Sequence, residues 1–167
     1  MMPIRFRYAV EGDLGRIVEI YNSTIASRRV TADTEPVSVE SKQEWFKQHS
    51  PDKRPLWVIE NEAGQLIAWA SFQSFYGRPA YDGTVEVSIY IDTAFRGKGI
   101  GKEILQFCIE NAPNFGIKTL LGFIFAHNYP SLKLFEHFGF STWGTFPKVA
   151  VLDETEVDLL ILGKRLC

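Results

Sequence analysis

Residues 84–105 read TVEVSIYIDTAFRGKGIGKEIL, a run rich in β-branched and aromatic residues followed by a turn and a glycine-rich segment. The β-branched and aromatic content of residues 84–91 favours a strand, and apolar residues at helical spacing predict a helix over residues 99–111. The glycines at 97, 99 and 101 allow backbone N–H groups to approach a ligand closely. Because the N-terminus of a helix also attracts anions, the stretch predicts a strand, loop and helix that bind phosphate.

The spacing of these glycines argues against two nucleotide-binding motifs. A P-loop needs a glycine five residues before its Gly-Lys pair and Ser or Thr after it, and those places hold Arg96 and Glu103. The dinucleotide fingerprint needs a further glycine three residues after its first pair, and no such glycine follows either candidate pair. A nucleotide-binding domain is therefore only a weak alternative.

The rest of the chain predicts alternating strands and helices around this unit. Residues 56–60 and 66–73 flank a turn and indicate an antiparallel hairpin. This order is typical of the α/β class, with a mixed sheet covered by helices, and residues 1–167 are expected to form a single domain. The other expected elements are strands at 4–8, 119–126 and 156–162 and helices at 14–21, 41–49 and 131–137.

Composition limits the partners of the chain. The sequence has 18 Lys and Arg against 20 Asp and Glu, a formal charge of -2, and no basic run, so nucleic acid is not an expected partner. It shows neither a signal peptide nor an apolar stretch of about 18 residues, so we expect a cytoplasmic protein that does not enter the membrane. No metal site is expected, and Cys108 is interpreted as a packed apolar residue.

Two motifs in order resemble the GCN5-related N-acetyltransferase (GNAT) superfamily. Residues 96–101, RGKGIG, resemble its Gln/Arg-x-x-Gly-x-Gly/Ala signature, while Asn128, Ser131 and the Gly139–Phe140 pair resemble its Asn-x-x-Ser/Ala and Gly-Phe segment. The resemblance implies the GNAT fold, in which two central strands of a mixed sheet splay apart, and acetyl-CoA (coenzyme A) as cofactor. The alternatives are a glycine-rich turn without a ligand and, for Asn128, a turn or helix-cap residue.

The resemblance also implies which residues bind the cofactor. The loop amides would hold the pyrophosphate, strand backbone would pair with the pantetheine amides, and a strand amide near Ser88 would hold the oxyanion. The cofactor-binding residues expected on this basis are Ser88, Ile89, Tyr90, Ile91, Arg96, Gly97, Lys98, Gly99, Ile100, Gly101, Lys102, Asn128 and Ser131.

Other segments resemble a subfamily, the phosphinothricin and amino-acid N-acetyltransferases. They include IYNSTIASRRVTADTEPVS, EWFKQH and FYGRPAY. The resemblance implies a small amino acid or analogue as the amine acceptor, and a homodimer. A carboxylate calls for a planar cation, so Arg78 is a candidate, with Phe75 and Tyr81 lining the same pocket; a solvated loop arginine is the alternative. The roles of Thr34 and Glu35 stay open.

Glu86 is the candidate catalytic base, because an ammonium group must lose a proton before it attacks. It matches the glutamate of the family's Thr-Val-Glu, although an exposed strand glutamate is the alternative. Phe135 stands where many members have a tyrosine acid, so the thiolate, with a thiol pKa of about 8.5, would leave without a donor. His127 is more often structural at a strand end than a base.

The leading function is thus direct acetyl transfer to a small amine in a ternary complex. A binding module that senses acyl-CoA or scaffolds a partner without turnover is the alternative from another class. Coenzyme A binding without acetyl transfer would favour that alternative.

Overall fold

The computed structural model describes residues 2–166 and contains a sheet of seven strands in the order β1-β2-β3-β4-β5-β7-β6. The pair β4–β5 is parallel, whereas the other neighbouring pairs are antiparallel, which confirms a mixed α/β sheet. The strands are β1 (Ile4–Tyr8), β2 (Leu56–Asn61), β3 (Leu66–Ser74), β4 (Thr84–Ile91), β5 (Thr119–Phe125), β6 (Ser141–Leu152) and β7 (Thr155–Arg165). The helices are α1 (Leu14–Ser23), α2 (Gln43–Lys47), α3 (Ile100–Asn111) and α4 (Tyr129–His137).

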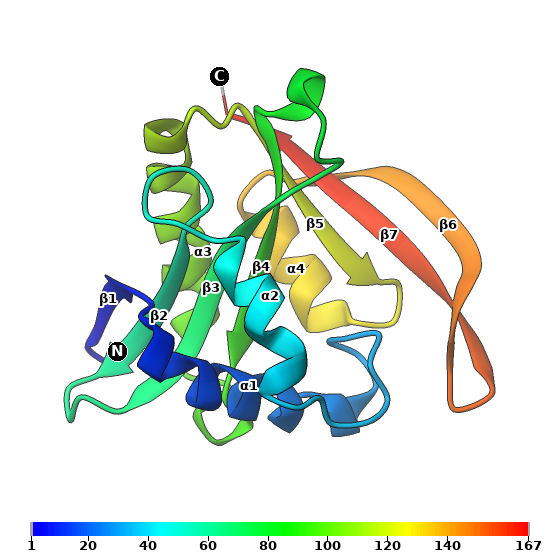
Figure 1. The fold of residues 1–167 in the computed structure, drawn as a ribbon. Helices are drawn as coiled ribbons and strands as arrows, with labels where there is room; N and C mark the ends of the chain where they lie inside the picture. The colour runs from blue at the N-terminus through cyan, green and yellow to red at the C-terminus, as the bar shows by residue number, and fades with distance from the viewer. Residues whose placement is uncertain (1, 167) are drawn as a thin grey trace.

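Helices cover both faces of the sheet, as Figure 1 shows with α1 and α2 in front and α3 and α4 behind. Successive side chains of a strand point to opposite faces, so each apolar strand supplies two cores. Leu56 and Val58 of β2 pack in the core under α1, whereas Trp57 and Ile59 pack in the larger core that holds α3. The near-continuous apolar strands of the sequence are therefore explained by burial on both sides.

The centre of the sheet opens between β4 and β5. Their parallel pairing covers only Thr84–Glu86 of β4 and Thr119–Leu121 of β5. Beyond that point β4 continues to Ile91 paired with β3 alone, and β5 continues to Phe125 paired with β7. The two strands thus part halfway along their length, as the resemblance predicted.

Most expected elements are present, with small shifts at their ends. The hairpin of β2 and β3 is confirmed. Helix α3 begins at Ile100, because Gly99 has a φ of 78° and lies in the left-handed region just before it. Helix α4 begins at Tyr129, two residues earlier than expected, because Asn128 caps it.

The sequence interpretation was wrong to leave residues 141–152 without a strand. They form β6, which pairs with β7 at the edge of the sheet. Register shifts between Thr142 and Gly144 and between Phe146 and Ala150 interrupt the pairing, and the side chains are mostly exposed, so no apolar alternation marks the strand. Pro147 falls inside the second irregular stretch, where no ladder N–H is needed.

Residues 2–166 contain neither a membrane-spanning helix nor a cluster of metal-binding side chains. No helix in this part of the chain is long and apolar enough to cross a membrane. Within the same residues, no group of three or more His, Cys, Asp and Glu side chains could hold a metal ion.

Candidate active site

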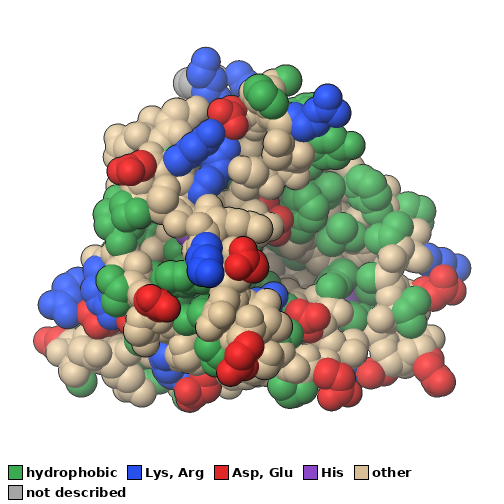
Figure 2. Space-filling model, viewed as in Figure 1, with side chains coloured by type: hydrophobic (Ala, Val, Ile, Leu, Met, Phe, Trp, Pro, Cys, Tyr) green, Lys and Arg blue, Asp and Glu red, His purple; other side chains and the backbone are tan. Residues whose placement is uncertain are grey.

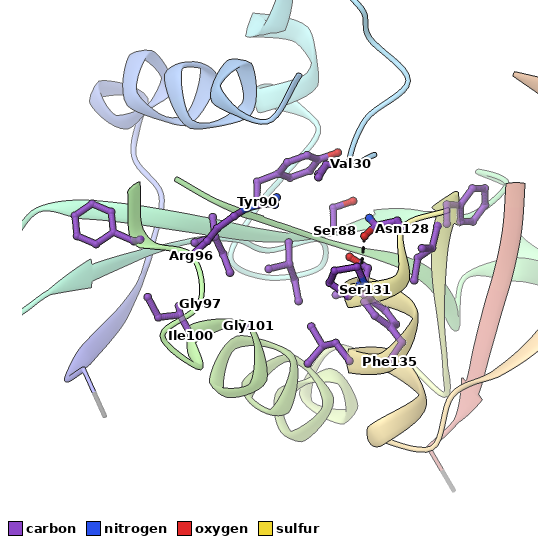
Figure 3. A pocket seen from close by; sticks show the side chains of 18 of the residues that line it. Val30, Ser88, Tyr90, Arg96, Gly97, Ile100, Gly101, Asn128, Ser131 and Phe135 are labelled. Atoms are coloured by element: carbon purple, nitrogen blue, oxygen red, sulfur yellow. Dashed lines mark hydrogen bonds between the residues drawn. The ribbon is translucent and has the colours of Figure 1, made fainter. Parts of the chain in front are cut away.

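The gap between β4 and β5 opens into a cavity of about 420 Å3, bounded by α3 on one side and α4 on the other (Figure 3). Of the residues predicted to bind the cofactor, only Lys98 and Lys102 do not line it. Sequence reasoning missed much of the apolar part of the wall, which is made by residues with no motif of their own. These are Val30, Val87, Phe95, Phe123, Ile124, Pro130 and Leu134, and Phe135, noted in the sequence only in the place of a tyrosine acid, joins them.

The glycine-rich loop forms one end of this first cavity. Gly97 and Gly99 have φ angles of 76° and 78°, a conformation that side chains with a Cβ rarely adopt. The chain then enters α3, whose N-terminal N–H groups lack partners within the helix. Asp92 fixes the start of the loop, because it accepts the N–H of Ala94 at 2.9 Å and pairs with Arg16 of α1 at 2.5 Å. The loop is therefore a preformed cradle that fits a phosphate group.

Asn128 and Ser131 of α4 form the opposite wall (Figure 3). The Asn128 side chain accepts the Ser131 N–H at 3.4 Å and donates to the Arg29 carbonyl at 3.2 Å. It is buried, with 7% of its surface exposed. Asn128 is thus a helix cap, the alternative left open by the sequence, and it also lines the first cavity.

Phe135 closes the back of the cavity and offers no proton. Its side chain is buried and packs over Gly122 of β5, where a Cβ atom would come within 2.6 Å of the ring. The absence of a side chain at Gly122 therefore makes room for this ring. The site has an apolar surface at the position where a tyrosine acid was considered.

A second cavity of about 230 Å3 lies on the other face of the sheet, under α1 and α2, and Figure 2 shows this face hollowed beside α2. Its floor is a two-stranded ladder in which Trp69 pairs with Tyr90, Ser71 with Ser88, and Gln73 with Glu86. Sequence reasoning missed most of this cavity, because its residues come from segments far apart in the chain. The remaining residues of its lining are Ile17, Val18, Tyr21, Val37, Lys42 and Trp45.

Aromatic rings build much of the second cavity. Trp69 stacks on Tyr90 with ring centroids 4.6 Å apart, and the edge of Trp45 meets Trp69 at 5.2 Å. Tyr21 of α1 lies 5.0 Å from Tyr90 and hydrogen-bonds to Asp33. Burial and this carboxylate raise the pKa of Tyr21 to about 12, so its hydroxyl keeps its proton at neutral pH.

The two cavities meet at β4. Glu86, Ser88 and Tyr90 line both of them, and Glu86 is the last residue of β4 that pairs with β5. Burial raises the pKa of the Glu86 carboxyl, an effect that hydrogen bonding with Ser88 partly opposes. A raised carboxyl pKa lies closer to neutrality, where a base accepts a proton most effectively. The arrangement places a candidate base between two binding spaces.

Several residues singled out in the sequence lie outside both cavities. Phe75, Arg78 and Tyr81 are on the exposed loop between β3 and β4, where the Phe75 and Tyr81 rings meet edge to face at 5.9 Å. His127 Nε2 bonds to the Arg28 carbonyl at 2.7 Å and lines a separate groove. Neither Thr34 nor Glu35 contributes to the lining of the two cavities. A role for the loop residues in substrate binding stays a prediction.

Comparison with known proteins gives consistent matches. The sequence pattern of the Acetyltransferase (GNAT) family matches residues 17–140. YwnH of Bacillus subtilis (strain 168), which carries the provisional name phosphinothricin acetyltransferase, is 58% identical over 160 residues, covering 96% of this chain and 98% of that protein. An L-methionine sulfoximine/L-methionine sulfone acetyltransferase of Pseudomonas aeruginosa is 31% identical over 148 residues, covering 89% and 86%. The crystal structure of a GNAT superfamily phosphinothricin acetyltransferase from Sinorhizobium meliloti in complex with acetyl-CoA superimposes with a TM-score of 0.91 at 27% identity, covering 98% and 89%.

Proposed function

Because the chain belongs to the GNAT family of acetyltransferases, we propose that it transfers the acetyl group of acetyl-CoA to the amine of a small amino acid or analogue, such as phosphinothricin. One observation carries the proposal: Glu86 and Ser88 line both the cavity beside the glycine-rich loop and the cavity on the opposite face. A donor in the first cavity and an acceptor in the second would meet at these residues. The names of the relatives support the acceptor class.

The first cavity fits acetyl-CoA. The left-handed Gly97 and Gly99 and the start of α3 would hold the pyrophosphate. The part of β4 beyond Glu86 has no partner strand on the side of β5, so its backbone groups are available to the pantetheine amides. Acetyl-CoA supplies the acetyl group as a thioester, which makes the acyl carbon open to attack by an amine.

The residues at the junction would activate the amine. Glu86 would accept a proton from the acceptor ammonium, leaving a neutral amine that attacks the acyl carbon. A backbone N–H of β4 near Ser88 would donate to the oxygen that becomes negative. Phe135 has no proton to give, so the thiolate would leave unaided, which its ordinary pKa of about 8.5 permits. The transfer needs both substrates at once and no covalent acyl-enzyme.

A thiol-release assay tests the proposal. Purified protein is mixed with acetyl-CoA and a panel of acceptors that includes phosphinothricin, L-methionine sulfone, L-methionine sulfoximine and ordinary amino acids, and free coenzyme A is measured. Release that depends on an amino-acid acceptor, with the N-acetyl product identified by mass spectrometry, is the expected result. Tight coenzyme A binding without release for any amine would favour the sensor alternative.

The homodimer and the cytoplasmic location stay predictions that rest on the sequence. In support of a dimer, the chain exposes Phe75, Tyr76 and Tyr81 in one aromatic group, and larger exposed apolar patches mark interaction surfaces. Figure 2 also shows hydrophobic side chains gathering on the β5–β7–β6 side of the molecule. Light scattering would give the mass in solution, and cell fractionation the location.

A further inference from the structure

The second cavity contains one cationic side chain among the described residues that line it, Lys42. Lys42 ends the short 3₁₀ turn Glu40–Lys42 just before α2 and is half-buried. Its ammonium lies 5.3 Å from the centre of the Tyr21 ring, a cation–π contact that holds it at the cavity wall. Within residues 2–166 no carboxylate oxygen lies within 4.0 Å of this ammonium, so its charge has no ion-pair partner there.

A second observation in the same cavity points to a ligand. Ser71 is 1% exposed, and its hydroxyl has no hydrogen-bond partner among the described residues. A buried hydroxyl without a partner costs free energy, and native structures rarely keep one unless a bound molecule or water satisfies it. Ser71 stands opposite Ser88 in the β3–β4 ladder, beside the residues where the amine would react.

From these contacts we propose that Lys42 binds the negatively charged carboxylate of the acceptor and that the Ser71 hydroxyl hydrogen-bonds to the same molecule. The inference rests on the proposed function. Among the described residues that line the cavity, Glu86 is the one carboxylate and Lys42 the one ammonium, and an amino acid carries the complementary pair of an ammonium and a carboxylate. Lys42 thereby takes the role that the sequence analysis gave to Arg78, which lies on the exposed loop outside the cavity.

Matched pairs of acceptors test the role of Lys42. L-methionine sulfone and L-leucine are each compared with their carboxamides, which keep the amine and side chain but lose the negative charge. Lys42→Met should raise the KM for the two acids by about ten- to hundredfold, the range of a hydrogen bond to a charged group. The KM for the carboxamides and for acetyl-CoA should change less than threefold, and Lys42→Arg should recover part of the loss.

Lys47→Met is the matched control, because Lys47 lies on α2 close by but is 70% exposed and lines neither cavity. It should leave every KM unchanged. Ser71→Ala should raise the acceptor KM several-fold while keeping or raising the melting temperature of the free protein, since it removes an unsatisfied buried hydroxyl. A merely structural serine would lower that temperature and leave the KM alone.

Calorimetry of acceptor binding to the coenzyme A-loaded protein separates this inference from the proposed function. Acid-selective binding that Lys42→Met abolishes supports the inference even if no acetyl transfer occurs, in which case the proposed function fails alone. Acetyl transfer in which Lys42→Met affects acids and carboxamides equally, or not at all, overturns the inference and leaves the function standing. Loss of acid selectivity in Arg78→Ala but not in Lys42→Met also overturns it.

Discussion

Glu86 combines three properties that a catalytic base needs and that an exposed strand glutamate lacks. It lines both cavities, it lies where β4 leaves β5, and burial raises its pKa. The chain thus keeps a carboxylate in a place where its ionised form is poorly solvated. Such a residue should be favourable for activity and unfavourable for stability.

Glu86→Gln should lower kcat by about a hundredfold or more at neutral pH while the affinity for acetyl-CoA stays the same. The variant keeps the shape of the side chain and loses its basicity. Because higher pH supplies more free amine, the variant should recover part of its rate as the pH rises. Steady-state kinetics between pH 6 and 9 check this, with Glu62→Gln in the exposed β2–β3 turn as control. A parental rate for Glu86→Gln between pH 6 and 8 would show that another group takes the proton.

The same substitution has a stability effect whose sign follows from the raised pKa. Below the pKa of about 4.3 that Glu86 has in the unfolded chain, the carboxyl is protonated in both the folded and the unfolded state. Its ionisation then takes no free energy of unfolding from the parent relative to the variant. As the pH rises through the higher folded pKa, the unfolded state gains charge first, so the parent loses stability. The melting temperature of Glu86→Gln should therefore exceed that of the parent by a margin that grows as the pH rises from about 4 through the folded pKa of Glu86.

Helix α4 and strand β5 meet through a contact that shapes the first cavity. Phe135 of α4 packs over Gly122 of β5, and a Cβ at Gly122 would lie 2.6 Å from the ring. Gly122→Ala should cost about 1–3 kcal/mol through overpacking and should weaken acetyl-CoA binding, because the displaced ring lines the cavity. Thermal unfolding and calorimetry check both effects.

The double variant Gly122→Ala with Phe135→Leu tests the cause of these losses. A smaller side chain at position 135 leaves room for the new methyl group, so stability and binding should both improve relative to Gly122→Ala. No recovery in the double variant would mean that the glycine serves the strand backbone and not the fit to Phe135.

The helix α1 is tied to the first strand by an ion pair. Arg7 of β1 donates to both carboxylate oxygens of Asp13 at 2.8 and 2.9 Å, and Asp13 also accepts the Val10 N–H at 2.8 Å. Burial opposes the ionisation of Asp13, but these hydrogen bonds outweigh it and lower its pKa. The contact fixes α1 over the sheet, where its residues form one wall of the second cavity.

Asp13→Asn should destabilise the protein by about 1–2 kcal/mol at neutral pH, near the low end for a charged hydrogen bond because Arg7 stays 36% exposed. The folded pKa is lowered, so the stabilisation is present above the unfolded pKa of about 3.9 and is lost as the pH falls through the folded value. Denaturant unfolding at pH 7 and pH 3 should show that the difference in free energy of unfolding between parent and variant is smaller at pH 3. An equal difference at both pH values would contradict the ionic origin.

The sequence was sufficient for the parts of the molecule that local pattern determines. The hairpin of β2 and β3 and the glycine-rich turn before α3 follow from contiguous segments and are present in the structure. Most residues expected to bind the cofactor line the first cavity, and their role in binding stays a prediction. Strand β6 was not predictable in this way, because its pairing with β7 and not its own pattern makes it a strand. The second cavity was missed for a related reason, since Lys42, Trp45 and Ser71 meet only through folding.

Binding of acetyl-CoA should stabilise the whole chain, because the first cavity exists only in the folded state. At a concentration one hundred times the Kd, the gain is about 2.7 kcal/mol, which corresponds to a rise of about 5–10 °C in melting temperature for a chain of this size. Gly101→Glu should abolish the rise, since it would place a bulky anion at the glycine-rich end of the cavity, where its Cβ would also lie 3.3 Å from the Leu134 side chain. Gly15→Glu, on the exposed face of α1, should keep it. An undiminished rise in Gly101→Glu would place the cofactor elsewhere.

The short pairing of β4 with β5 has a mechanical consequence. Strands β1 to β4 form one part of the sheet and strands β5 to β7 form the other. The parallel ladder that joins the two parts spans only Thr84–Glu86 and Thr119–Leu121. Glu86 therefore lies at the point where the two parts of the sheet separate. A molecule that contacts both free strand edges would hold the two parts together, and a small increase in their separation would weaken its binding. Acetyl transfer beside Glu86 and release of coenzyme A would then depend on the same few residues.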